Sequence, residues 1–127
     1  MKTRPLILLV DDDVTLLRTI GAQIGLEGFD TVLSSTATSA IEVLKGQSVD
    51  LVIIDLFMPD RDGIETITDI RTHWPDLPII AISGGWRTIG ADTVLEMALA
   101  IGAQSALAKP FDRATLMAAI KAALRRA

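Results

Sequence analysis

The sequence alternates strictly between short apolar runs and longer amphipathic segments, and this alternation limits the folds that the chain can adopt. The apolar runs have the length of strands, which we predict over 5–10, 29–34, 49–55, 77–82 and 104–108. The segments between them carry apolar residues at spacings of three and four, which predicts helices over 14–27, 37–46, 63–73, 91–102 and 112–126. Five strand–helix units in this order predict an α/β fold: a doubly wound, five-stranded parallel sheet with helices on both faces.

The polarity of each run indicates its place in the sheet. The runs 5–10 and 49–55 are almost entirely apolar, as is typical of central strands buried on both sides. The run 29–34 is more polar, and we predict that it lies at an edge. Asp13 precedes the first helical segment, where its carboxylate is suited to cap the helix.

The composition narrows the classes of protein to which the chain can belong. Its 127 residues, half of them hydrophobic, suit one domain, which we predict over 1–127. No apolar run is long enough to cross a bilayer, and the absence of cysteine excludes disulfides, thiolate metal sites and a cysteine nucleophile. A net charge of −4 argues against direct nucleic-acid binding by the chain itself. We therefore expect a cytoplasmic protein that contacts neither membrane nor nucleic acid.

Reactive side chains stand where the apolar runs end. Asp11 and Asp12 follow the first run and Asp55 ends the third, while Ser83 and Lys109 follow the fourth and fifth. Because the carboxyl ends of parallel strands share one edge of a sheet, we expect these side chains to converge there.

Carboxylates gathered in this way are suited to a divalent cation and a phosphoryl group. Mg²⁺, or Mn²⁺ in its place, prefers oxygen ligands; we predict direct bonds from Asp12 and Asp55, with Asp11 acting through water. Asp55 is the lone acid at the end of a central strand, and we predict that it is a nucleophile that forms an aspartyl phosphate. Lys109 can neutralise charge on the transferred group, and Ser83 can donate one hydrogen bond to it.

These motifs, in this order, closely resemble the receiver domain of two-component response regulators. The resemblance covers essentially the whole chain and is carried by four motifs: Asp11-Asp12, the run Asp-Leu-Phe-Met-Pro-Asp-Arg-Asp-Gly over 55–63, Ser83-Gly84, and Lys109-Pro110-Phe111. It implies a flavodoxin-like (βα)5 fold with strand order 2-1-3-4-5.

The resemblance also implies a role for each site residue. Asp55 would be the phosphoacceptor, Asp12 a direct magnesium ligand assisted by Asp11, and the backbone carbonyl of Phe57 a third protein ligand. Ser83 would be a switch hydroxyl that moves toward the phosphoryl group, and Lys109 would form an ion pair with that group. The Lys109-Pro110 peptide bond is usually cis in this family.

Two departures from the family pattern concern the output of the switch. The family usually places an aromatic residue three positions before the lysine, where this chain has Ala106. The segment from Ser83 to Lys109 is also longer than in the family pattern, by roughly one helical turn. We place the surplus in 84–90 and predict an output surface that comprises Gly84, Gly85, Trp86, Arg87 and Ala106.

The predicted function is a signalling phosphoacceptor rather than an enzyme. A partner histidine kinase or histidine phosphotransfer protein would phosphorylate Asp55 and so switch the surface over 84–102 for docking of a downstream protein or for phosphorelay. The chain carries no recognisable DNA-binding module. The sequence also leaves open whether the chain forms a homodimer through the helix 91–102, the strand 104–108 and the helix 112–126.

Two other functions remain open from the sequence. The pattern Asp11-x-Asp13-x-Thr15 matches small phosphatases of the haloacid dehalogenase type, in which Asp11 would be the nucleophile and Asp13 the acid/base. That interpretation leaves Asp55 without a role and lacks sequence for a substrate cap. The other alternative is a degenerate receiver that acts only as a binding module.

Overall fold

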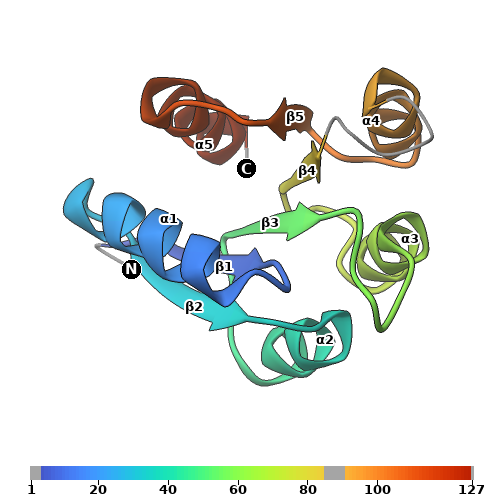
Figure 1. Ribbon diagram of the computed structural model, residues 1–127. Coiled ribbons are helices and arrows are strands. Elements are labelled where there is room, and N and C mark those ends of the chain that lie inside the picture. The colour runs from blue at the N-terminus through green and yellow to red at the C-terminus, as the bar shows by residue number, and fades with distance from the viewer. Residues whose placement is uncertain (1–3, 85–90, 127) are drawn as a thin grey trace.

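Five parallel strands form one sheet in the order β2-β1-β3-β4-β5 (Figure 1). The structure is a computed structural model that describes residues 4–84 and 91–126. The strands are β1 (Leu6–Val10), β2 (Asp30–Ser34), β3 (Leu51–Asp55), β4 (Ile79–Gly84) and β5 (Ser105–Lys109). The helices are α1 (Val14–Leu26), α2 (Ala37–Gly46), α3 (Gly63–His73), α4 (Ala91–Ala100) and α5 (Arg113–Arg126). The predicted flavodoxin-like α/β fold and its strand order are confirmed.

Each face of the sheet carries its own apolar core, because neighbouring residues of a strand point to opposite faces. Leu8 and Val10 of β1 belong to the core shared with α2, α3 and α4, whereas Ile7 and Leu9 belong to the core shared with α1 and α5. Figure 1 shows the same division, with α1 and α5 on one side of the sheet and the other helices opposite. Full burial of each such side chain contributes about 1.5–3 kcal/mol, so the sheet is well supported on both faces.

The strands occupy the places that their polarity predicts. All five residues of β3 are buried, and β1 lies between β2 and β3 in the sheet. β2 is an edge strand and is more exposed than either of them. β5 forms the other edge and is mostly half-buried. Among the described residues, no helix has both the length and the hydropathy that are needed to cross a membrane.

Strands β4 and β5 extend further than the sequence predicts. Ser83 pairs with Ala108 and Gly84 with Lys109, so Ser83 and Lys109 lie within the strands rather than after them. The predicted boundaries were wrong because parallel pairing continues past the apolar residues for as long as both backbones stay extended. Both side chains are therefore held by the sheet itself.

The helix ends and turns follow the local sequence. The Asp13 side chain accepts a hydrogen bond from the backbone N–H of Leu16 at 3.0 Å, which confirms it as the cap of α1. Gly28 and Gly102 adopt φ values of 98° and 116°, the left-handed region that favours glycine, just after α1 and α4. The Lys109-Pro110 bond is cis, as the family resemblance implies.

Candidate functional site

Three carboxylates lie together at the carboxyl edge of the sheet. One carboxylate oxygen from each of Asp11, Asp12 and Asp55 lies within 4.8 Å of the other two. Asp11 and Asp12 follow β1, and Asp55 ends the neighbouring strand β3. Asp11 and Asp55 are buried, whereas Asp12 faces solvent. This arrangement brings together the three acids that the sequence singles out, although their roles as ligands stay predictions.

Lys109 enters this cluster from β5. Its Nζ atom lies 2.8 Å from Oδ2 of Asp11 and 3.3 Å from Oδ2 of Asp55, so one ammonium serves two buried carboxylates. Burial acts to lower the pKa of Lys109, but the hydrogen bond to Asp11 and the nearby negative charges outweigh it and raise the pKa. Lys109 therefore stays cationic, and a formal excess of two negative charges remains at the cluster.

The environment of Asp55 opposes its negative charge. Burial raises the pKa of Asp55 to about 6, from 3.8, and the charge of Asp11 acts in the same direction. The backbone N–H of Phe57, which donates to Oδ1 of Asp55 at 3.1 Å, and the ammonium of Lys109 oppose this shift only in part. A cation bound beside Asp55 would favour its ionised form, which is the form that acts as a nucleophile.

Ser83 presents a buried hydroxyl in the strand next to Asp55. The residue is fully buried, and its Oγ atom has no hydrogen-bond partner among the residues that the structure describes. Asp55 pairs with Ile82, so Ser83 lies one position further along β4. A buried hydroxyl without a partner costs about 1–3 kcal/mol. The Ser83 hydroxyl is thus available to donate to a bound group.

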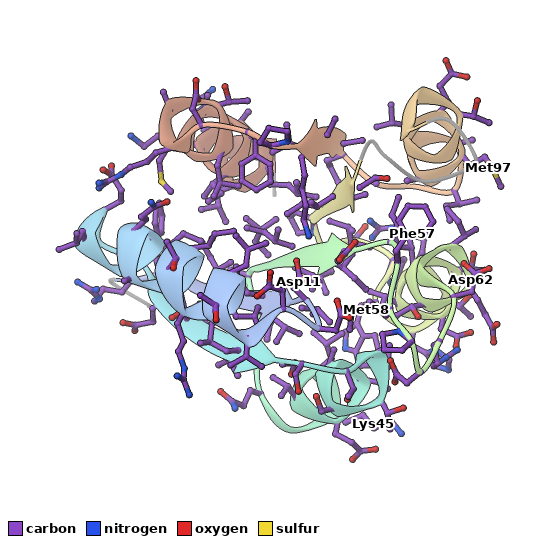
Figure 2. All side chains as sticks on the ribbon, viewed as in Figure 1. Asp11, Lys45, Phe57, Met58, Asp62 and Met97 are labelled. Carbon is purple, nitrogen blue, oxygen red and sulfur yellow. The ribbon has the colours of Figure 1, made fainter. Side chains whose placement is uncertain are left out.

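The backbone that follows Asp55 turns back on itself over Leu56–Asp62 (Figure 2). The N–H of Gly63 donates to the carbonyl of Leu56 at 3.2 Å, and Phe57 forms an isolated β-bridge with Asp62. A Cβ atom on Gly63 would lie 2.4 Å from Cα of Leu56, so only glycine allows this close approach. The loop is therefore closed at its base. The Phe57 carbonyl as a metal ligand remains a prediction.

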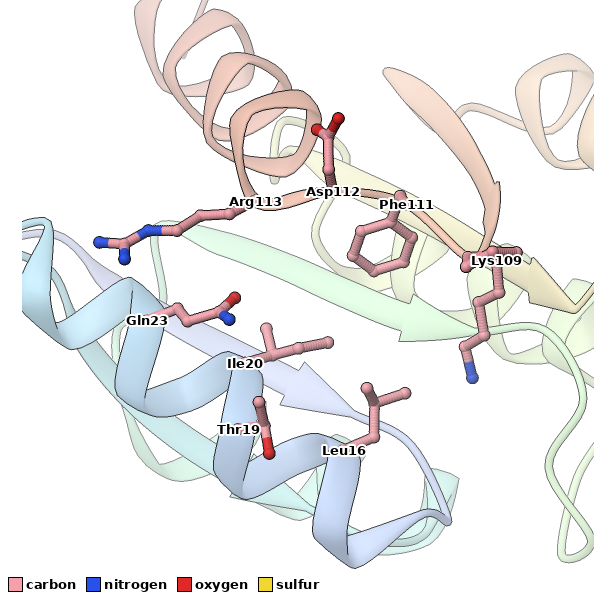
Figure 3. Close-up of a pocket in the computed structure, with 9 residues that line it drawn as sticks. Leu16, Thr19, Ile20, Gln23, Lys109, Phe111, Asp112 and Arg113 are labelled. Atoms are coloured by element: carbon pink, nitrogen blue, oxygen red, sulfur yellow. The ribbon is translucent and has the colours of Figure 1, made fainter.

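A groove of about 440 Å³ lies between α1 and the turn that connects β5 to α5 (Figure 3). Leu16, Ile20 and Phe111 supply apolar side chains to its lining, and Lys109 lies at one end. Sequence reasoning did not find this groove, because its two walls are separated by about 90 residues of chain. Periodicity within either segment carries no signal that the two lie side by side.

Comparison with known proteins identifies the family to which the chain belongs. Residues 7–121 match the family described as the response regulator receiver domain. The chain belongs to this family. Receiver domains are signalling phosphoacceptors that bind Mg²⁺ at an acidic pocket, and the cluster of Asp11, Asp12 and Asp55 could hold such an ion.

Relatives of this receiver domain are named as transcriptional regulators. The chain is 37% identical over 120 residues to the transcriptional regulatory protein CpxR homolog of Haemophilus influenzae, covering 94% of this chain and 50% of that protein. It is 33% identical over 121 residues to the transcriptional regulatory protein KdpE of Mycobacterium tuberculosis, covering 95% and 51%. The chain thus spans about half the length of these relatives.

Solved structures of receiver domains superpose closely on this one. A response regulator receiver domain protein from Clostridium thermocellum matches with a TM-score of 0.88 and 27% identity, covering 96% of this chain and 95% of that one. The beryllofluoride-activated NtrC4 receiver domain dimer matches with a TM-score of 0.85 and 28% identity, covering 94% and 96%.

Within residues 4–84 and 91–126, Asp13 stands apart from the cluster of Asp11, Asp12 and Asp55 in this receiver domain. Its carboxylate caps α1, while its backbone N–H donates to Oδ1 of Asp11 at 2.9 Å. The phosphatase alternative needs Asp13 as an acid/base beside Asp11. The capping contact gives the Asp13 carboxylate a different role, and the alternative loses its support.

Part of the predicted output surface can be placed. Ala106 pairs with Ala81 and packs against the core beneath α2, α3 and α4, and Gly84 ends β4. Gly85, Trp86 and Arg87 lie outside the described residues.

Proposed function

We propose that this receiver domain is a switch in which Asp55 accepts a phosphoryl group from the phosphohistidine of a partner kinase or phosphotransfer protein. One observation carries the proposal: the carboxylate of Asp55 lies among Asp11, Asp12 and Lys109. The hydroxyl of Ser83, one position beyond the level of Asp55 on β4, has no partner among the described residues and adds a hydrogen-bond donor.

The transfer exchanges one bond to phosphorus for another. A carboxylate oxygen of Asp55 attacks the phosphorus, the bond from phosphorus to the histidine nitrogen breaks, and the electron pair of that bond stays on the nitrogen. Asp12, Asp55 and the Phe57 carbonyl would hold Mg²⁺ directly and Asp11 would hold it through water; the ion would neutralise charge on the phosphoryl oxygens. The ammonium of Lys109 adds a second positive charge.

The charge of the cluster supports a divalent ion. Three carboxylates and one ammonium leave a formal excess of two negative charges, which Mg²⁺ or Mn²⁺ would balance. Phosphorylation then adds close to two negative charges at neutral pH. Lys109, held by Asp11 and Asp55 before transfer, would turn toward the phosphoryl group, and Ser83 would donate to it.

The output would pass through the surface over 84–102. A coupling free energy of about 1–3 kcal/mol would suffice for a useful change in the affinity for a downstream protein. The relatives that bear the name of transcriptional regulators are twice as long as this chain, so their output can reside in the part that it does not match. We expect this receiver domain to act without direct nucleic-acid contact and without turnover of a substrate. The beryllofluoride-activated NtrC4 receiver domain is a dimer, and a homodimer through α4, β5 and α5 would be a second form of output here.

Incubation with acetyl phosphate and Mg²⁺, followed by mass spectrometry, tests the proposal. The wild type should gain one acid-stable, base-labile phosphoryl group that maps to Asp55, and Asp55→Asn should gain none. Asp13→Asn is the matched control and should be phosphorylated as the wild type is.

Other results would separate the alternatives. Sustained release of phosphate together with an adduct on Asp11 would identify a phosphatase. No adduct on the wild type, with partner binding unchanged by Asp55→Asn, would identify a degenerate receiver that serves only as a binding module.

A further inference from the structure

Asp60, in the loop after β3, caps a helix that is distant in the sequence. Its Oδ1 atom accepts from the backbone N–H of Ala37, and its Oδ2 atom accepts from the N–H and the hydroxyl of Thr38, each at 3.1 Å. Ala37 and Thr38 are the first two residues of α2. These hydrogen bonds lower the pKa of Asp60 despite the opposing effect of burial, so the carboxylate stays ionised over the helix start.

The cap from Asp60 supplements a local cap from Thr36. The Thr36 hydroxyl accepts from the N–H of Ser39 at 3.0 Å, and the Thr36 carbonyl accepts from the N–H of Ala40 at 3.2 Å. Thr36 and Asp60 thus divide the first four N–H groups of α2 between them. A helix with a threonine cap does not need a remote carboxylate to form. The contact between Asp60 and α2 therefore matters chiefly for the order of the loop that carries Asp60.

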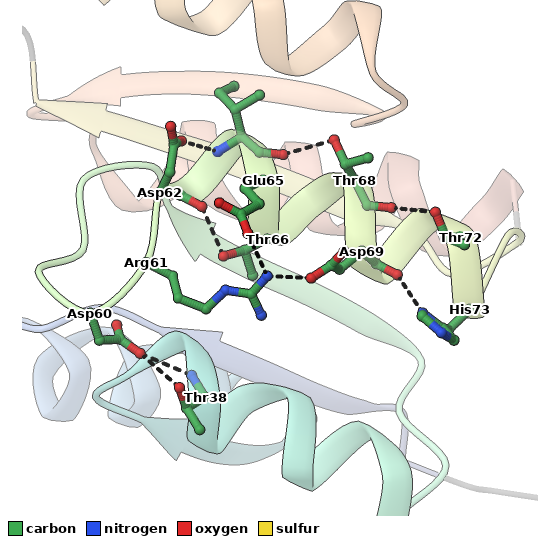
Figure 4. A network of polar contacts seen from close by, with 11 residues as sticks. Thr38, Asp60, Arg61, Asp62, Glu65, Thr66, Thr68, Asp69, Thr72 and His73 are labelled. Carbon is green, nitrogen blue, oxygen red and sulfur yellow. Dashed lines mark hydrogen bonds and ion pairs between the residues drawn. The ribbon is translucent and has the colours of Figure 1, made fainter.

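Three consecutive residues of this loop, 60–62, bind to two different helices (Figure 4). Arg61 pairs with Glu65 and Asp69 of α3, and Asp62 caps α3 by accepting from the N–H of Ile64 at 2.8 Å. Both contacts join the loop to the helix that follows it directly. Asp60 instead joins the loop to α2, across the carboxyl edge of the sheet.

The contact of Asp60 completes a series of interactions that leads from the backbone beside Asp11 to the backbone beside Asp55. On one side the N–H of Asp11 donates to the carbonyl of Ser34 at 3.1 Å, close to the start of α2. On the other side the N–H of Phe57 donates to Asp55 at 3.1 Å, at the beginning of the loop. Asp60 joins α2 to the loop and so connects the backbone beside Asp11 with the backbone beside Asp55.

The geometry points to Asp60 as a positioning residue for the metal site: its contact with α2 holds the loop Leu56–Asp62 so that Mg²⁺ binds to an already ordered backbone. The inference rests on the proposed function, because the Phe57 carbonyl lies in this loop. A loop that is ordered before binding loses less conformational entropy when the ion arrives. Loss of outer contacts of this kind typically weakens metal affinity by about 10–100-fold.

Two matched variants distinguish an effect of Asp60 on the loop from an effect on the stability of α2. Asp60→Ala and Thr36→Ala each remove one half of the α2 cap, and each should lower the melting temperature by a few degrees. Isothermal titration with Mg²⁺ should give a Kd about 10-fold weaker for Asp60→Ala and less than about 2-fold weaker for Thr36→Ala. Asp60→Asn keeps one acceptor oxygen and should recover part of the affinity.

Hydrogen exchange in the absence of metal supplies a readout that does not depend on the ion. Amides of 56–62 should exchange faster in Asp60→Ala than in Thr36→Ala, whereas amides of α2 should respond alike in both. Equal Mg²⁺ affinity in the wild type and Asp60→Ala, or equal weakening by both alanine variants, would overturn the inference and leave the proposed function intact. A wild type that binds no Mg²⁺ would instead refute the metal site itself. If Asp60→Ala does not fold, Asp60→Asn carries the same comparison.

Discussion

The two ends of the sheet differ in how their polar side chains are paired. At the amino ends of the strands two half-buried side chains pair with strand backbone, and only the hydroxyl of Ser105 lacks a partner among the described residues. Asp50 accepts from the N–H of Leu6 at 2.7 Å, and Gln104 accepts from the N–H of Ile79 at the same distance. At the carboxyl ends three carboxylates crowd within 4.8 Å, and the hydroxyl of Ser83 has no partner among the described residues.

The difference separates stability from function within one small domain. A paired polar group contributes to the free energy of unfolding, whereas crowded acids and an unpaired hydroxyl lower it. Such a deficit persists where the groups serve a ligand. Under the proposed function, a cation or a phosphoryl group would supply at the carboxyl end the pairing that side chains supply at the amino end.

Arg71→Ala should cause the greatest loss of stability and would test the amino end. The guanidinium of Arg71 donates to the carbonyls of Trp74, Pro75 and Gly102 at 2.8–3.1 Å, and so joins the end of α3 to the turn before β5. Its removal breaks all three hydrogen bonds, two of which are partly buried, and we expect a loss of about 2–4 kcal/mol in urea unfolding.

Arg71→Lys is the control for this variant. A single ammonium cannot span three carbonyls, so lysine should restore only a minor part of the stability. Mg²⁺ affinity should be unchanged in both variants. A large loss of Mg²⁺ affinity would show that the two ends of the sheet are coupled rather than separate.

Asp55→Asn should have the opposite effect and stabilise the metal-free protein. The pKa of Asp55 is raised from 3.8 to about 6, chiefly by burial, so its charged form disfavours folding at neutral pH. We expect a gain of about 1–3 kcal/mol at pH 8, since each pKa unit corresponds to about 1.4 kcal/mol. Chemical unfolding without Mg²⁺ measures it.

The pH dependence of stability gives the sign of this effect. A raised pKa means that the folded protein holds the Asp55 proton more tightly than the unfolded chain does. The contribution of Asp55 is thus complete below pH 3.8 and is lost as the pH rises through about 6. The gain from Asp55→Asn should accordingly grow between pH 4 and 7. A gain that is constant over this range would show that burial of the charge is not its cause.

Ser83→Ala should stabilise the protein by a smaller amount, about 1 kcal/mol, because it removes a buried hydroxyl that has no partner within residues 4–84 and 91–126. The same variant should lower the stability of the phosphoryl adduct or of its beryllofluoride mimic. A loss of stability in the unphosphorylated protein would mean that the hydroxyl has a partner in solution.

Asp13→Ala should lower the free energy of unfolding, by no more than the amount that Ser83→Ala should add to it. Loss of the α1 cap costs about 1 kcal/mol, whereas Mg²⁺ affinity should stay as in the wild type. Asp12→Ala, one residue away, should abolish Mg²⁺ binding without loss of stability. If Asp13→Ala weakened Mg²⁺ binding as strongly as Asp12→Ala, the division of roles within this turn would be wrong.

The prediction from sequence succeeded where the signal is local. The alternation of apolar runs predicted the fold, and the polarity of 29–34 predicted an edge strand, because burial on one or both faces acts on each residue separately. The acids at the ends of neighbouring strands were expected to meet, and Asp11, Asp12 and Asp55 do. Strand boundaries were less accurate because backbone pairing extends beyond apolar side chains.

Contacts between distant segments carried no such signal. An acid after Pro59 resembles any turn residue, and nothing near Asp60 in the chain indicates that its partners are Ala37 and Thr38. The same holds for Arg71 and Gly102, which are 31 residues apart.

Periodicity and strand-end chemistry were enough to establish which layers this receiver domain forms and which acids it gathers at one edge. The three-dimensional arrangement was needed to assign the single ammonium of Lys109 to Asp11 and Asp55, and the carboxylate of Asp60 to α2. The reason is physical: burial patterns depend on each residue's own hydropathy, whereas a charged side chain pairs with whichever group the packed elements bring within about 3 Å.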